Sequence, residues 1–192
     1  IDFNDGNITT IVGPNGCGKT TLLSCLNSSA KVTSGNICIN DIDFLKLPLK
    51  ERAREVAFLP QIRTVIPVLP VRTLVEHGRF PYLGFTRRKS KEDIDIVNQS
   101  MDEPVTYLDL EGKRNFFDML KKLRQAGKTI ILVLHELSDA IRISDNIVIM
   151  NDRKIVAHGT PDECISSHII EDVFHTTYKK FSDEDGDYYI FL

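Results

Sequence analysis

A glycine-rich motif that can hold the phosphates of a nucleotide spans residues 13–20, with the sequence GPNGCGKT. It fits the pattern G-x-x-x-x-G-K-[ST]. The glycines allow successive backbone N–H groups to turn inward and form an anion-binding nest. Lys19 supplies a positive charge for the β- and γ-phosphates. The hydroxyl of Thr20 can coordinate Mg²⁺, an ion that keeps most of its waters and takes few protein ligands.

The segments around this motif support the same interpretation. The β-rich apolar segment 8–12 precedes it, and residues 21–26 have the composition of a starting helix, whose N-terminal dipole favours phosphate. The alternative is a glycine-rich turn that binds nothing, but the order of strand, loop and helix argues against it. We therefore expect the nucleotide to contact Asn15, Gly16, Cys17, Gly18, Lys19, Thr20 and Thr21.

Two adjacent carboxylates, Asp102 and Glu103, stand before Pro104 and are a second candidate for chemistry. Like charges repel and proline ends a strand, so the pair is a poor structural choice. Beside a phosphate loop, Asp102 can hold Mg²⁺ directly or through water. Glu103 can orient and deprotonate the attacking water, a contribution of ~10²–10⁴ in rate. Taken alone, the two carboxylates could equally form a solvated turn or a catalytic site. Because the sequence also contains the phosphate loop, we favour the catalytic site.

Strand and helix patterns alternate along the 192 residues, which predicts one α/β domain with a mainly parallel sheet. The apolar segment 129–134 has the composition of a central parallel strand. His135 follows it, at the edge where ligands bind in open α/β sheets, and its imidazole can donate to a phosphate oxygen. The alternative role for His135 is a cap of the next helix. The further expected elements are strands at 36–40, 55–59, 146–150, 154–157 and 188–192, a turn at 151–153, and helices at 49–54, 71–78, 90–100, 113–125, 137–143 and 168–174. Another helix is expected to start at 160–163, with Thr160 as its cap, Pro161 at its first position and Glu163 at its third.

The position of the acidic pair conflicts with this pattern. A pair of this kind should follow a buried strand, yet residues 92–100 have the apolar spacing of a capped helix. We therefore expect the sequence to be interrupted near Ser100 and Met101. The chain also begins in the middle of a strand pattern at Ile1, so we expect upstream residues.

Composition limits the partners. The net charge is −3, which provides no broad basic field and argues against nucleic acid. No apolar run approaches the ~20 residues that cross a bilayer. The four cysteines have no metal-binding spacing, and we expect small buried thiols in a reducing cytosol.

Taken together, these motifs resemble, in family order and over almost the whole chain, the ATP-binding subunit of an ABC transporter. Residues 13–20 match its Walker A loop, 59–61 (LPQ) its Q-loop and 101–103 the end of its Walker B motif. Residues 107–109 (YLD) are similar to its D-loop, and 134–136 (LHE) to its switch region. The implied fold is an α/β P-loop NTPase of the ABC-ATPase type, with a mainly parallel central sheet, flanking helices and additional antiparallel strands.

The resemblance also implies roles. Gln61 would contact Mg²⁺ and the attacking water and sense the membrane partner. Asp109 would lie at the dimer interface beside the nucleotide, and His135 would contact the γ-phosphate. The family's signature motif, Leu-Ser-Gly-Gly-Gln or similar, is missing from the sequence, and the aromatic residue that stacks on adenine cannot be assigned. True absence of the signature would leave ATP binding without efficient hydrolysis.

Segments 71–82 and 103–109 are similar to importers of iron–siderophore complexes, haem and cobalamin. This resemblance implies an ATPase that powers import, with iron–siderophore complexes as the favoured cargo. It implies two copies that sandwich ATP, transmembrane permease subunits that hold the chain at the inner face of the membrane, and an extracytoplasmic binding protein that acts indirectly. The alternative is a non-transport ATPase of the ABC type, or an ATP-gated binding module that acts on a soluble partner.

Overall fold

The computed structural model describes residues 1–59, 69–84, 87–102, 110–183 and 186–192. The chain divides into two compact units, which are described one at a time. The first comprises Ile1–Ser24 with Tyr107–Leu192, and the second comprises Cys25–Thr106. In the ranges given above, no helix combines the length and the apolar character needed to cross a membrane.

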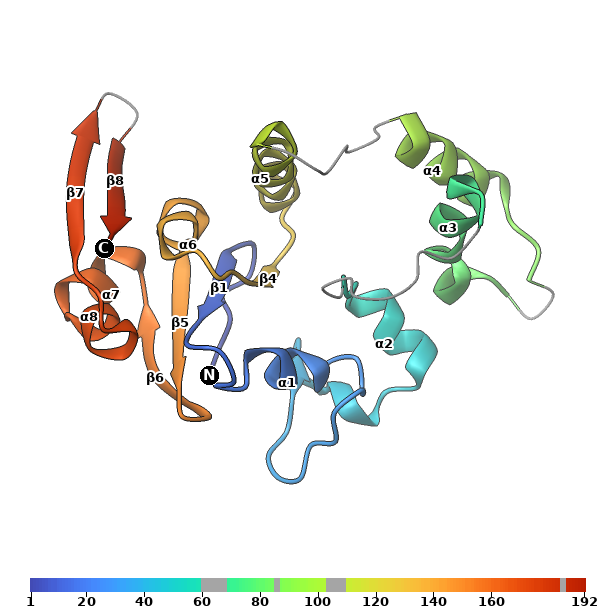
Figure 1. Ribbon diagram of the computed structural model, residues 1–192. Coiled ribbons are helices and arrows are strands. Elements are labelled where there is room, and N and C mark those ends of the chain that lie inside the picture. The colour runs from blue at the N-terminus through green and yellow to red at the C-terminus, as the bar shows by residue number, and fades with distance from the viewer. Residues whose placement is uncertain (60–68, 85–86, 103–109, 184–185) are drawn as a thin grey trace. The chain divides into compact units, whose positions relative to one another are not determined.

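The first unit is built on a four-stranded sheet with the order β4-β1-β5-β6 (Figure 1). The central strand β1 (Ile8–Val12) is fully buried and pairs in parallel with β4 (Ile130–Val133) and β5 (Asn146–Asn151). Strand β6 (Lys154–Gly159) pairs antiparallel with β5. The predicted α/β fold with a mainly parallel sheet is thereby confirmed.

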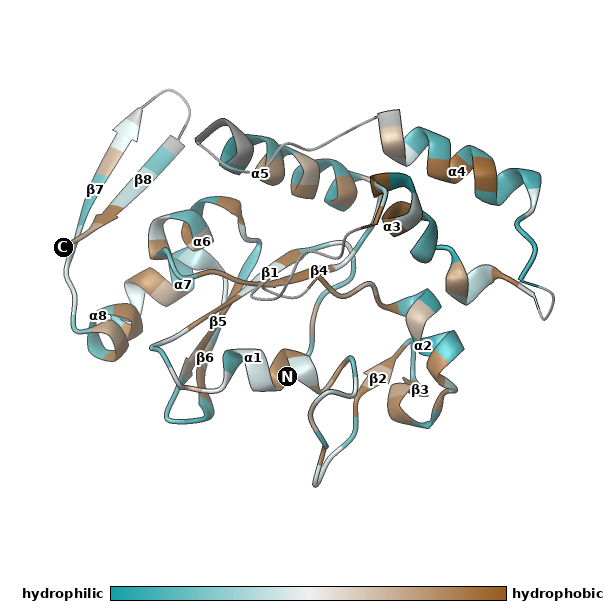
Figure 2. Ribbon diagram, turned by 45° about the vertical axis from the view of Figure 1, so that its right-hand side comes forward, coloured by the Kyte–Doolittle hydropathy of each residue, from teal (hydrophilic) through white to brown (hydrophobic). Residues whose placement is uncertain are grey.

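Helices cover this sheet and supply its core. The amphipathic helix α5 (Leu110–Gln125) and α6 (Leu137–Ile143) bury Phe117, Leu120 and Ile143 together with Ile8 of β1. Figure 2 shows the alternation of hydrophobic and hydrophilic segments along α5. The remaining elements of this unit are α1 (Lys19–Ser24), α7 (Pro161–Ser166), α8 (Ile169–Phe174) and the antiparallel hairpin of β7 (Tyr178–Asp183) and β8 (Gly186–Phe191).

The predicted start of α7 is confirmed in detail. The hydroxyl of Thr160 accepts a hydrogen bond from the backbone N–H of Glu163, and the Glu163 carboxylate accepts one from the N–H of Thr160. This reciprocal capping box satisfies two of the N–H groups that a helix N-terminus leaves free.

The second unit is mostly helical. Its core includes Phe44, which is 1% exposed. The helix predicted to begin after Ser90 is present, and the Ser90 hydroxyl accepts a hydrogen bond from the backbone N–H of Asp93. The elements are β2 (Cys38–Ile39), β3 (Ile42–Asp43), the 3₁₀ helices η1 (Phe44–Lys46) and η2 (Phe80–Tyr82), α2 (Leu49–Glu55), α3 (Val71–His77) and α4 (Lys91–Asp102).

Three expectations need correction. Residues 55–59 do not form a strand: Glu55 ends α2, and Leu59 is 79% exposed, so its apolar side chain has no sheet to pack on. Strand β4 lies at one end of the described sheet order instead of its centre, and its four residues are half-buried. Only Cys17 and Cys164 are buried; Cys25 is half-buried and Cys38 is exposed.

Candidate functional site

The backbone of the loop after β1 depends on its glycines. A Cβ atom on Gly13 would lie 2.2 Å from the carbonyl oxygen of Met150 and 2.7 Å from the Sγ of Cys17, so no larger residue fits there. Gly16 and Gly18 have φ angles of +81° and +102°, which side-chain-bearing residues rarely adopt. The spacing in the sequence therefore reflects both the curvature of the loop and its close contact with β5.

Lys19 is buried inside this loop, with 5% of its surface exposed. Its Nζ donates hydrogen bonds to the carbonyl oxygens of Gly13 at 2.7 Å and Pro14 at 2.9 Å, and lies 3.8 Å from the Sγ of Cys17. These partners are uncharged. The ammonium charge is therefore available to an anion that reaches the loop.

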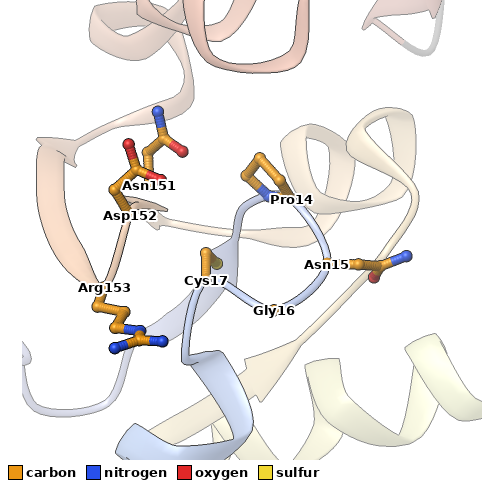
Figure 3. Close-up of a pocket in the computed structure, with 7 residues that line it drawn as sticks. All are labelled: Pro14, Asn15, Gly16, Cys17, Asn151, Asp152 and Arg153. Carbon is orange, nitrogen blue, oxygen red and sulfur yellow. The ribbon is translucent and has the colours of Figure 1, made fainter.

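A pocket of about 440 Å³ opens between the loop and the turn that joins β5 to β6. The loop side consists of Pro14, Asn15, Gly16 and Cys17, and the turn side of Asn151, Asp152 and Arg153 (Figure 3). The side chain of Asn15 points away from the turn, while the turn residues lie across the pocket from the loop.

Sequence reasoning treated residues 151–153 as a turn and missed their place beside the loop. The two apolar strands would have indicated this place only together with the strand order. Strand β5 runs parallel to β1, with Val12 paired to Ile149, so the segments that follow the two strands emerge at the same edge of the sheet. The left-handed backbone of Asp152 and Arg153, with φ of +45° and +64°, reverses the chain there.

His135 lies at this same edge. Strand β4 ends at Val133, which pairs in parallel with Ile11, so the segment that carries His135 leaves the sheet beside the start of the phosphate loop. The side chain of His135 is exposed. The predicted position of His135 after a strand is confirmed, and its contact with phosphate stays a prediction.

The other predicted site residues divide into two groups. The loop brings together Asn15, Gly16, Cys17, Gly18 and Lys19, followed at the start of α1 by the exposed Thr20 and Thr21. Gln61, Glu103 and Asp109 lie outside the described residues. Asp102 is the last residue of α4, in the second unit, and so follows a helix instead of the expected strand.

Within the residues that the structure describes, no group of three or more His, Cys, Asp and Glu side chains is arranged to hold a metal ion. A magnesium site that uses Asp102 and Gln61 therefore stays a prediction.

Comparison with protein families matches residues 1–142 to the model described as "ABC transporter". The probable siderophore transport system ATP-binding protein YusV of Bacillus subtilis is 32% identical over an alignment of 209 positions, gaps included. The alignment covers 88% of this chain and 76% of that protein. The ferric enterobactin transport ATP-binding protein FepC of Escherichia coli is 28% identical, and the alignment covers 91% of this chain and 79% of that protein.

Solved structures share the fold. An inward-facing metal-chelate type ABC transporter superimposes with a TM-score of 0.80 at 18% identity, covering 100% of this chain and 88% of that chain. The dimeric ATP-binding cassette MJ0796 with bound ADP and phosphate superimposes with a TM-score of 0.70 at 21% identity, covering 84% of this chain and 88% of that chain.

Proposed function

This chain belongs to the ABC transporter family as the ATPase subunit of an importer, and we propose that the cargo it helps to import is an iron–siderophore complex. The observation that supports this cargo most directly is the similarity to siderophore-transport ATP-binding proteins over most of the chain. The similarity of segments 71–82 and 103–109 to such importers points the same way. The cargo itself would not touch this chain.

ATP would bind at the loop after β1. The backbone N–H groups of the loop and the ammonium of Lys19 are suited to the β- and γ-phosphates, because Lys19 is already buried at the loop with uncharged partners. The cation of Arg153, across the pocket from the loop, adds a further group that attracts an anionic ligand. These contacts are suited to binding and orienting the triphosphate.

The Thr20 hydroxyl is exposed beside Lys19 and is of the oxygen type that Mg²⁺ prefers, so the loop fits that ion. We assign Gln61 and Asp102 to the same ion. When bound, Mg²⁺ would neutralise charge on the phosphates.

The hydrolytic step would use three further residues. Glu103 orients the attacking water and accepts its proton. His135 donates to the γ-phosphate and stabilises the charge of the transferring phosphoryl group. Asp109 lies at the interface between two copies of the chain.

The proposed assembly has two copies of this chain, each of which closes on the ATP bound to the other. Dimerisation is a property of cassettes with this fold, as in the dimeric cassette described above. The copies would lie against transmembrane permease subunits on the inner face of the membrane, and an extracytoplasmic binding protein would reach them only through the permease.

The proposed interruption of the sequence near Ser100 and Met101 has support from two findings. The alignment with YusV has 209 positions, more than the 192 residues of this chain, so it contains positions without a counterpart here. In addition, α4 runs unbroken into Asp102, where a strand was expected. The missing positions would include the signature motif. The mass of the intact natural protein tests this proposal, because a value equal to the 21.8 kDa of this sequence would contradict it.

The variant Glu103→Gln tests the catalytic assignment in the natural full-length protein. We expect it to bind ATP normally and to lose about 10²- to 10⁴-fold in turnover, the contribution of a general base. Glu92→Gln, which neutralises an exposed carboxylate of α4, is the matched control and should keep full turnover. Normal turnover in Glu103→Gln would remove Glu103 from this role.

The cargo needs a separate test. Cells that lack this chain should lose uptake of a radiolabelled ferric siderophore and recover it when the wild-type chain is restored. Uptake that persists without the chain would contradict iron import. Co-purification with a soluble protein instead of a membrane permease would favour the alternative of a non-transport ATPase.

A further inference from the structure

Lys113 of helix α5 forms ion pairs with two carboxylates at the start of helix α6. Its Nζ lies 2.8 Å from Oε2 of Glu136 and 2.5 Å from Oδ2 of Asp139. Asp139 is 12% exposed at its side chain and also lies 3.5 Å from the guanidinium of Arg142. Both carboxylates raise the pKa of Lys113 above its ordinary value, and Lys113 lowers that of Glu136. Lys113 therefore stays charged throughout the physiological range of pH.

The Glu136 side chain is used for this pair instead of for its own helix. Glu136 is the N-cap residue of α6, but its side chain accepts no capping hydrogen bond from the first turn. Short polar side chains at this position ordinarily accept hydrogen bonds from the free N–H groups of the helix, whereas the longer glutamate does not. Here it accepts a hydrogen bond from Lys113, which lies 23 residues away in the sequence.

The ion pair between Lys113 and Glu136 fixes one end of the short connection between β4 and α6, and the sheet holds its other end. His135 stands between β4, whose last residue Val133 is paired with Ile11 of β1, and Glu136. The exposed imidazole thus lies on a connection anchored by the sheet at one end and by Lys113 at the other.

Helix α5 is itself a firm support, because Phe117 and Leu120 are buried against β1 and α6. The guanidinium of Arg142 lies 5.4 Å from the centre of the Phe117 ring, which adds a second link between the two helices. Lys113 lies close to the N-terminal end of α5.

We propose that Lys113 is a positioning residue for ATP hydrolysis, which holds Glu136 and thereby orients His135. This inference rests on the proposed role of His135 at the γ-phosphate. It assigns a role to a residue that the sequence indicated only as the start of a helix.

Steady-state hydrolysis by the natural full-length protein tests the inference through Lys113→Ala. We expect kcat to fall about fivefold with an unchanged KM for ATP, a change typical of losing one partly exposed ion pair in the transition state. Lys113→Arg should restore most of the rate, because arginine can pair with both carboxylates. Lys121→Ala, at an exposed lysine of the same helix, is the control and should be silent.

Variants of His135 separate this inference from the proposed function. If His135→Ala lowers kcat, then Lys113→Ala in that background should cause no further loss, because Lys113 acts through His135. If the two substitutions instead lowered kcat independently, so that their effects multiplied in the double variant, the positioning role of Lys113 would be overturned. A normal kcat in His135→Ala would instead contradict the proposed function of His135. A normal kcat in Lys113→Ala, with His135→Ala impaired, would overturn only the role of Lys113. Thermal unfolding of each variant identifies any loss that comes from misfolding.

Discussion

The ammonium of Lys19 donates a hydrogen bond to the carbonyl oxygen of Gly13, 2.7 Å away across the same loop. This hydrogen bond holds the lysine close to the geometry that it needs for a phosphate, so binding loses little side-chain entropy. Exchanging neutral carbonyl partners for anionic phosphate oxygens strengthens its hydrogen bonds, because the ammonium then also gains the attraction of an opposite charge.

Replacing Lys19 by alanine should therefore weaken ATP binding itself. The loss of about 2–3 kcal/mol corresponds to a Kd raised about 30- to 160-fold. Titration with a fluorescent ATP analogue measures this change, and Lys154→Ala, at an exposed lysine of β6, is the control that should bind normally. Equal affinities in wild type and Lys19→Ala would show that the ammonium makes no binding contact.

Gly13→Ala should destabilise the fold and not only the site. Its Cβ would lie 2.2 Å from the backbone oxygen of Met150, so β5 or the loop must shift. Such overpacking, added to an unfavourable backbone angle, costs about 3 kcal/mol or more in the free energy of unfolding. Chemical denaturation measures the change.

Gly6→Ala provides the contrast. Gly6 also has a positive φ, of +68°, but nothing lies within 4 Å of its added Cβ. Only the backbone strain remains, and we expect a loss of about 1 kcal/mol. If the two variants were equally stable, the contact with Met150 would not be what excludes larger residues at position 13.

Local patterns in the sequence predicted the parts of this fold that local forces determine. The phosphate loop follows from its glycines, and the start of α7 follows from the pairing of Thr160 with Glu163. The prediction of a strand at residues 55–59 was wrong, because a strand needs a neighbouring strand to pair with and β-propensity alone cannot supply one.

The relationships that depend on packing were out of reach of the sequence. Arg153 comes near the loop only because β5 lies beside β1, and Lys113 meets Glu136 only because α5 packs beside α6. Both contacts join residues far apart in the chain. Knowledge of the strand order would have indicated the first, and the second needs the placement of the helices.

Modification of Cys17 by a thiol reagent should abolish ATP binding, and bound ATP should protect against it. Cys17 is 5% exposed, lines the pocket and lies 3.8 Å from the Nζ of Lys19, so any group added to its sulfur would occupy the space around the loop. Mass spectrometry after timed labelling with and without ATP measures the protection. The exposed Cys38 should react equally fast in both samples, and Cys17→Ala should resist inactivation. Equal labelling of Cys17 in both samples would contradict the prediction.

The second unit should become less stable in acid because one carboxylate, that of Asp93, becomes protonated. Asp93 is 6% exposed and accepts hydrogen bonds from the hydroxyl and N–H of Ser90 and from the guanidinium of Arg79. These bonds, those from Ser90 first, lower its pKa from 3.8 to about 2. Because the folded value lies below the ordinary one, the ionised carboxylate stabilises the fold fully above pH 3.8, and this contribution is lost as the pH falls towards about 2.

The variant Asp93→Asn makes this pH window measurable. It should unfold at a lower temperature than the wild type at neutral pH, because asparagine cannot pair with the cation of Arg79. Below about pH 4 the difference between the two melting temperatures should shrink. It should be small at about pH 2, where half of the wild-type Asp93 carboxylates are protonated, and should vanish below that pH. Asp95→Asn, at an exposed position of α4, should show no such difference at any pH. A difference that closes near pH 6, or that persists undiminished at pH 2, would mean that another group controls the acid response of this unit.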